Sequence, residues 1–185
     1  MIRRLCVFCG ANVGARSIYA DAAREVGAAL VERGIALVYG GGNIGLMGVL
    51  ADAVLEKNGE VIGVIPESLR VREVAHDKLT ELHVVNSMHA RKALMADLSD
   101  AFVALPGGFG TLEELLEIAT WALLGFHRKP IGLLNTAGYF DPLLAQLDRA
   151  MEDGFLQSEH RRLLLVGDQV PLLLDTMTSA RPVQP

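Results

Sequence analysis

The sequence predicts a single α/β domain, in which one doubly wound, Rossmann-like parallel sheet carries helices on both faces. Three observations lead to this fold. Short, almost continuous runs of Val, Ile and Leu recur along the chain, stretches with helical periodicity separate them, and three of the runs end in glycine-bearing turns. Strands that are buried on both faces and joined by crossover helices produce this alternation. A chain of 185 residues, 51% of them hydrophobic, can bury one large core of this kind.

The elements follow one another in strict alternation. The apolar runs predict strands at residues 5–8, 35–39, 61–65, 82–85, 101–105, 131–134 and 163–166. Apolar residues spaced three and four apart predict helices near residues 17–33, 45–57, 87–98, 111–124, 140–153 and 169–178. The domain therefore spans residues 1–178, and residues 179–185 are expected to form a frayed tail.

Composition excludes several classes of partner. The formal net charge is −5 and the Lys and Arg residues are scattered, which argues against nucleic acid or an anionic membrane as the main partner. The apolar run at 5–8 is too short for a signal peptide, and no stretch approaches the length of a membrane span. We therefore expect a cytoplasmic protein.

Cys6 and Cys9 form a C-x-x-C pattern that would also suit a redox or zinc site. Residues three apart in a strand point to opposite faces, and there is no second cysteine pair. The histidines show no spacing typical of metal ligands. We expect two buried structural thiols and no metal site.

The carboxyl ends of parallel strands meet at one rim of the sheet, where ligands bind at the switch in topology. Glycine-bearing turns at residues 9–14, 40–45 and 106–110 each follow a predicted strand, so all three should line this rim. Gly40, Gly42 and Gly45 also satisfy G-x-G-x-x-G, with Glu67 just past the next strand, which suggests a dinucleotide site. However, this turn follows the second strand rather than the first, which favours a phosphate or base against residues 41–45.

The segment from Pro106 to Glu114 carries the strongest functional signal. Its glycines allow close approach of a ligand, and the first amides of the following helix form a ready anion site. Thr111 and Glu114 also match a T-x-x-E capping box, a purely structural use that can share Thr111 with a phosphate. Glu113 and Glu114 point about 100° apart on a helix, so they are not expected to act on one substrate as a pair.

Arg91 lies on the helical stripe of Met88, Met95 and Leu98, which is otherwise apolar. A guanidinium facing the interior needs an anion, whereas one that snorkels to the surface does not. The residues alone leave open whether Arg91 forms a structural pair, reaches solvent, or holds a ligand phosphate or a catalytic carboxylate. The later part of the helix at 111–124 is apolar almost all round, which predicts a homodimer with the site close to its seam.

Several motifs together resemble the Lonely Guy (LOG) family. They are Pro-Gly-Gly-x-Gly-Thr-x-x-Glu at 106–114, Met-His-x-Arg-Lys at 88–92, Gly-Gly-Gly-x-x-Gly-Leu-Met-Gly at 40–48, Phe-Cys-Gly at 8–10 and Lys-Pro-Ile-Gly-Leu-Leu-Asn at 129–135. The resemblance runs from about residue 5 to about residue 156. It implies a phosphoribohydrolase that cleaves the N-glycosidic bond of N6-substituted AMP, releasing the free base and ribose 5-phosphate without a metal or organic cofactor.

The resemblance also implies roles for individual residues. Arg91 and Glu114 match the catalytic pair of the family. The positions expected around the nucleotide are matched by Gly41, Gly42, Gly45, Glu73, Lys92, Gly108, Phe109, Gly110, Thr111, Leu112, Glu113 and Thr120. Ala11 departs from the family pattern, because many relatives have Ser there. Two other functions stay open: a non-catalytic carrier of a nucleotide or phosphate-bearing cofactor on the same fold, and nicotinamide-dependent redox chemistry.

Overall fold

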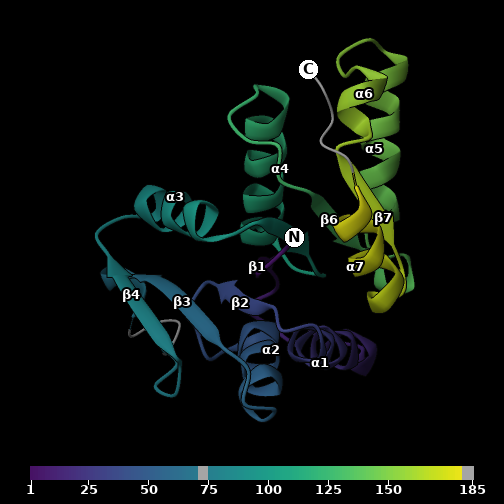
Figure 1. Ribbon diagram of the computed structural model, residues 1–185. Helices are drawn as coiled ribbons and strands as arrows, with labels where there is room; N and C mark the ends of the chain where they lie inside the picture. The colour runs from purple at the N-terminus through teal and green to yellow at the C-terminus, as the bar shows by residue number, and fades with distance from the viewer. Residues whose placement is uncertain (71–74, 181–185) are drawn as a thin grey trace.

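Seven strands form one parallel sheet (Figure 1). The computed structural model describes residues 1–70 and 75–180. The strands are β1 (Arg4–Phe8), β2 (Ala36–Tyr39), β3 (Val61–Pro66), β4 (Glu81–Val85), β5 (Ala101–Ala104), β6 (Ile131–Leu134) and β7 (Leu164–Gly167). Each coincides with an apolar run, so the predicted α/β fold with a parallel sheet is confirmed.

The main helices are α1 (Ser17–Glu32), α2 (Gly45–Leu55), α3 (Met88–Leu98), α4 (Phe109–Leu123), α5 (Asp141–Glu152) and α7 (Val170–Ser179). The short helix α6 (Ser158–Arg161) and two 3-10 turns, Glu67–Leu69 and Thr136–Gly138, were not predicted, because a single turn leaves no apolar period in the sequence. Ser179 ends α7, and residues 181–185 of the expected tail lie outside the described residues. Within the described chain, no helix combines the length and apolar character needed to cross a membrane.

The strand order places the candidate site. The order is β4-β3-β2-β1-β5-β6-β7, so the chain winds outward in one direction from β1 and in the other from β5. These two strands are neighbours, with Leu5 beside Ala101 and Phe8 beside Ala104. The loops that follow them therefore diverge from adjacent carboxyl ends, which is where doubly wound sheets bind ligands.

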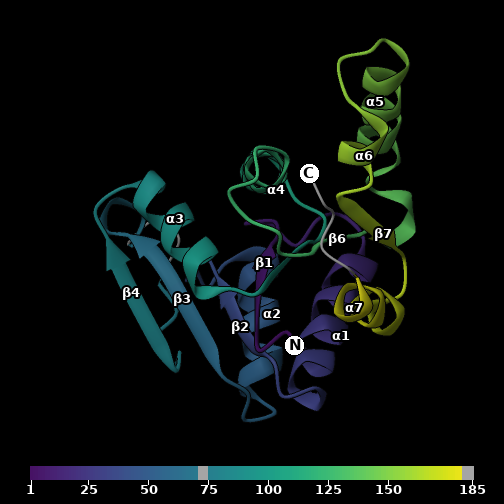
Figure 2. The same cartoon turned by 45° about the horizontal axis from the view of Figure 1, so that its top comes forward.

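Two hydrophobic layers cover the sheet (Figure 2). One layer packs α1, α2 and α7 against it, and the other packs α3, α4 and α5 against the opposite face. Cys6 belongs to the second layer and Cys9 to the first, as the strand alternation predicts. Both are free and buried, which confirms the interpretation of the C-x-x-C pattern as two structural thiols.

Candidate active site

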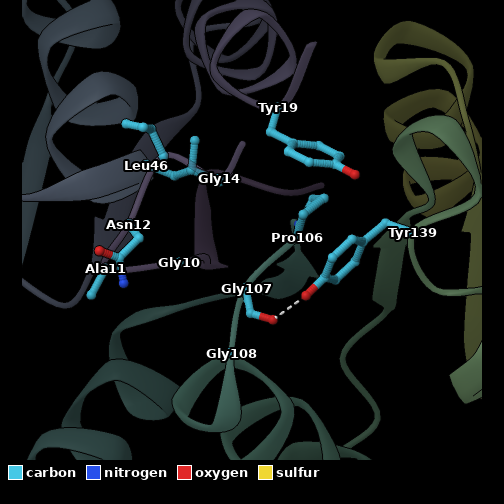
Figure 3. Close-up of a pocket in the computed structure, with 11 residues that line it drawn as sticks. Gly10, Ala11, Asn12, Gly14, Tyr19, Leu46, Pro106, Gly107, Gly108 and Tyr139 are labelled. Carbon is cyan, nitrogen blue, oxygen red and sulfur yellow. Dashed lines mark hydrogen bonds between the residues drawn. The ribbon is translucent and has the colours of Figure 1, made fainter. Parts of the chain in front are cut away.

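A pocket of about 200 Å³ opens at the switch in topology (Figure 3). The loop after β1 forms one wall with Gly10–Gly14, and the turn after β5 forms another with Pro106–Gly108. Leu46, Tyr19 and Tyr139 complete the lining. Two of the three glycine-bearing turns therefore meet in one pocket, and the rest of its wall comes from helices and from the loop after β6.

The two glycine turns are joined to each other through the backbone. The amide of Gly10 donates to the carbonyl of Pro106 at 3.1 Å, and the amide of Leu46 donates to the carbonyl of Gly10 at 2.9 Å. A Cβ at Gly107 would lie 2.1 Å from Oγ1 of Thr111, so only glycine allows this turn to fold against the helix. The pocket floor is therefore a connected backbone surface rather than two independent loops.

Helix α4 begins at Phe109, two residues earlier than predicted, and Gly108 is its N-cap residue. Thr111 is the third residue of the helix, so the prediction that it caps α4 in a capping box is wrong. The buried Thr111 side chain packs against Gly107, four residues earlier, instead of capping the helix. Among the described residues, no heavy atom comes within 4 Å of a Cβ placed at Gly108 or Gly110, so a ligand can approach the first amides of α4.

Glu114 lies on the inward face of α4. It follows Thr111 by three residues and precedes Ile118 by four, and both of these side chains are buried. Burial raises the pKa of the Cys9 thiol above its usual range, and the charge of Glu114 raises it further. The half-buried carboxylate therefore acts on the residue that follows β1, although Glu114 itself does not line the pocket.

Arg91 approaches the same place from α3. Its side chain is only 5% exposed, so the alternative that it snorkels to solvent is excluded. Its guanidinium lies against the backbone after β2, because a Cβ at Gly40 would come within 1.9 Å of Nη2. Burial raises the pKa of Cys6, Glu114 raises it further, and Arg91 opposes the rise. Both charges therefore act on the sulfur of Cys6 in β1, from two helices that cover the same face of the sheet.

Comparison with known proteins gives a family for this arrangement. Residues 47–177 match the protein family described as "Possible lysine decarboxylase". The chain is 55% identical over 163 residues to the rice (Oryza sativa subsp. japonica) cytokinin riboside 5′-monophosphate phosphoribohydrolase LOG, covering 88% of this chain and 67% of the rice protein. It is 48% identical to the Arabidopsis thaliana cytokinin riboside 5′-monophosphate phosphoribohydrolase LOG2, and the match covers 97% of this chain and 84% of the Arabidopsis protein. The chain belongs to the LOG family.

Solved structures show that the LOG-family fold is shared more widely. The molybdenum cofactor carrier protein from Chlamydomonas reinhardtii is 22% identical with a TM-score of 0.71, covering 97% of this chain and all of that one. The molybdenum cofactor binding protein from Rippkaea orientalis is 21% identical with a TM-score of 0.73, covering 97% of each chain. At these identities the likeness concerns the fold alone.

In this LOG-family chain the glycines of the turn after β2 have packing functions. A Cβ at Gly45 would lie 2.2 Å from the carbonyl carbon of Ala11, and the residue has a positive φ of 60°. Gly41 has a φ of 75° and packs on β3, and Gly42 forms a bridge with Ala75. The close contact and positive φ of Gly45 account for the last glycine of the G-x-G-x-x-G pattern without a dinucleotide.

Glu67, the candidate ribose-binding acid of a dinucleotide site, forms an ion pair instead. Glu67 is exposed in the turn after β3 and pairs with Arg70 at 3.3 Å. Such an exposed pair lies on the surface and outside the lining of the pocket. The structure therefore gives the nicotinamide alternative no support at this position.

We expect Gly45→Ala to destabilise the protein by at least about 2 kcal/mol, because the new Cβ meets backbone atoms and the left-handed conformation disfavours alanine. Urea unfolding of both proteins measures the difference. Gly110→Ala is the matched control, since its Cβ meets open space within a helix and should be neutral or stabilising by up to about 1 kcal/mol. Equal effects of the two changes would contradict the packing role of Gly45.

Lys92 and Glu113 lie between α3 and α4 and are not in the pocket lining. The Lys92 amine forms ion pairs with Glu113 and, at 3.0 Å, with Glu117. Burial lowers the pKa of Lys92, but the hydrogen bonds that its ammonium donates to both carboxylates outweigh this effect, so the pKa is raised and the amine stays charged. This cluster joins the helix of Arg91 to that of Glu114, and Glu117 is a member that no motif indicated.

The remaining predicted residues are dispersed. Thr120 is exposed, with its hydroxyl donating to the carbonyl of Leu116 at 2.7 Å, and Phe109 is 93% exposed. Leu112 packs against the core, and Glu73 lies outside the described residues. Tyr139 was missed because an aromatic after a predicted strand carries no motif, although its position beyond the carboxyl end of β6 could have indicated the pocket. The described part of the chain holds no group of three or more His, Cys, Asp or Glu able to bind a metal.

Proposed function

We propose that this LOG-family protein hydrolyses the N-glycosidic bond of nucleoside 5′-monophosphates, with N6-modified AMP preferred, releasing an adenine-type base and ribose 5-phosphate. The observation that carries the proposal is the pair of charges, buried Arg91 and half-buried Glu114, that both act on Cys6 in β1, the strand whose following loop lines the glycine-bearing pocket. Relatives that share about half of their residues with this chain are named as phosphoribohydrolases, which supports the same activity.

The reaction needs a carboxylate beside the sugar. The bond between C1′ and the base nitrogen breaks with its electron pair going to the base, which takes up a proton, and the oxygen of water bonds to C1′. Positive charge develops on the ribose ring during this step, and a fixed carboxylate stabilises it or activates the water. We assign this role to Glu114, with Arg91 orienting it or meeting the developing negative charge.

The 5′-phosphate needs donors rather than a broad basic surface. The loop after β1 and the turn at Gly107 and Gly108 line the pocket, and no side chain at Gly108 or Gly110 covers the first amides of α4. Binding energy from the phosphate then positions C1′ for reaction. Ala11, in place of the frequent Ser, provides no hydroxyl here, so the donors of this loop are its backbone amides and the side-chain amide of Asn12.

Assembly as a homodimer is part of the proposal. Helix α4 and the residues after it present several large apolar side chains to solvent: Leu116, Leu123, Leu124 and Phe126. A second copy that covers this surface would lie close to Glu114 on the same helix. Light scattering coupled to size-exclusion chromatography tests the assembly, with Leu124→Lys expected to favour the monomer. We further propose a cytoplasmic location, which two free buried cysteines suit.

A pyridoxal phosphate mechanism, which the words lysine decarboxylase suggest, does not fit these residues. Such an enzyme needs a lysine amine free to form a Schiff base in its pocket. No lysine lines the pocket among the described residues. Lys92 is held by two carboxylates, and Lys129 donates to the carbonyl of Ala96 at 2.8 Å.

Incubating the purified protein with AMP and with isopentenyl-AMP, followed by chromatography of the products, tests the activity. Release of base and ribose 5-phosphate is the expected result, and the ratio of the two rates measures the preference for a modified adenine. Intact nucleotide in both reactions, together with tight binding by calorimetry, would replace this proposal by the carrier function. NAD(H) and NADP(H) serve as controls, and we expect neither to raise the thermal stability of the protein.

A further inference from the structure

Tyr139 contributes a side-chain hydrogen bond to the turn of the pocket after β5. It follows the 3-10 turn after β6 and is 39% exposed at the pocket wall. Its hydroxyl donates to the carbonyl oxygen of Gly107 at 2.6 Å (Figure 3). A phenol at this distance fixes the carbonyl to which it donates.

The ring of Tyr139 is held in place before any ligand arrives. It packs edge-on against the rings of Tyr19, at 5.6 Å, and of Phe140, at 5.0 Å between centroids. The backbone amide of the buried Phe140 donates to the side-chain oxygen of Asn135 at 2.7 Å. Ala137, within the preceding turn, has a left-handed φ of 53°, a conformation that the surrounding contacts must maintain. The turn therefore presents Tyr139 in one orientation.

The carbonyl of Gly107 and the amide of Gly108 belong to one peptide group. This group is planar and trans, so the two point in opposite directions. Fixing the carbonyl toward Tyr139 therefore turns the Gly108 amide away from Tyr139, at the start of α4. Two adjacent glycines allow this peptide to rotate more freely than other residues would, so a fixed orientation needs an external contact.

We infer that Tyr139 is a positioning residue that orients the Gly107–Gly108 peptide for the 5′-phosphate, and that it thereby sets the preference of the pocket for phosphorylated ribose over unphosphorylated ligands. The inference rests on the proposed function for the identity of the ligand. It assigns a role to the loop after β6, which none of the glycine motifs includes. Removing the hydroxyl leaves the pocket shape and the catalytic residues in place, while the peptide loses its fixed orientation.

Tyr139→Phe tests the inference by isothermal titration calorimetry with ribose 5-phosphate and, separately, with adenine. We expect the Kd of ribose 5-phosphate to rise about three- to tenfold, which corresponds to the net contribution of one hydrogen bond. The Kd of adenine should stay within twofold. In AMP hydrolysis, KM should rise by a similar factor with kcat little changed. Thr176→Val is the control, because it removes another hydroxyl that donates to a backbone carbonyl, at 2.8 Å on the distant α7.

An unchanged Kd for ribose 5-phosphate would overturn the inference, and so would equal weakening of both ligands, which indicates a general loosening of the pocket. Thermal unfolding of Tyr139→Phe verifies that the variant is folded. Binding by the wild type without hydrolysis would remove the proposed activity, while the binding comparison would still decide the role of Tyr139. The two failures are therefore distinguishable.

Discussion

Replacing Glu114 by glutamine is expected to lower kcat for AMP hydrolysis by about 10²–10³-fold, because the amide has the shape of the carboxylate but cannot stabilise positive charge on the ribose. KM should change little, since the backbone groups proposed to bind the 5′-phosphate are left intact. Steady-state kinetics with chromatographic detection of the base measures both constants. Thermal unfolding verifies that the variant is folded, so that a lower kcat reports on the carboxylate.

Glu113→Gln is the matched control for this prediction. Glu113 is the neighbouring residue of the same helix, but its carboxylate is half exposed and pairs with Lys92 instead of facing the end of β1. We expect kcat/KM to change by at most about fivefold, because an exposed ion pair contributes only about 1 kcal/mol or less. Equal losses in the two variants would show that the total charge of α4, and not the position of Glu114, determines the rate.

The fold was predictable because its signals are local and repeated. Strands such as β3 and β6 are buried on both faces, so every residue in them must be apolar and the run is visible in the sequence. The prediction was wrong where two local arrangements competed. The sequence pattern at Thr111 is that of a helix cap, but this side chain packs against Gly107, and the helix starts two residues earlier with Gly108 as its N-cap residue.

The site was predictable only in part. Carboxyl ends of adjacent parallel strands must meet, so the two glycine turns beside β1 and β5 could be brought together from sequence. The burial of Arg91 could not be predicted, because a position on the apolar stripe of a helix does not distinguish a snorkelling side chain from a buried one. The contact between Gly40 and Arg91 could not be predicted either. Whether a glycine makes room for a ligand or for a side chain depends on what lies opposite it in the fold.

This contact between Gly40 and Arg91 gives the second large expected effect. Arg91→Ala should lower kcat/KM by about 10²–10³-fold, because the active site loses its buried positive charge. Gly40→Ala should lower it by about 10²-fold without removing that charge, since the new Cβ displaces the guanidinium from its position. The atom to be moved is the end of a flexible side chain, so urea unfolding should show a smaller loss of stability for Gly40→Ala than for Gly45→Ala.

The double variant decides whether these two effects have one cause. If Gly40→Ala acts by displacing Arg91, it has nothing left to displace once that side chain is removed. Gly40→Ala combined with Arg91→Ala should then be no less active than Arg91→Ala alone, a coupling of about 2.7 kcal/mol that corresponds to the 10²-fold effect of the single change. Independent, multiplying losses would show instead that Gly40 contributes through the turn after β2 and that the position of the guanidinium is not what limits the reaction.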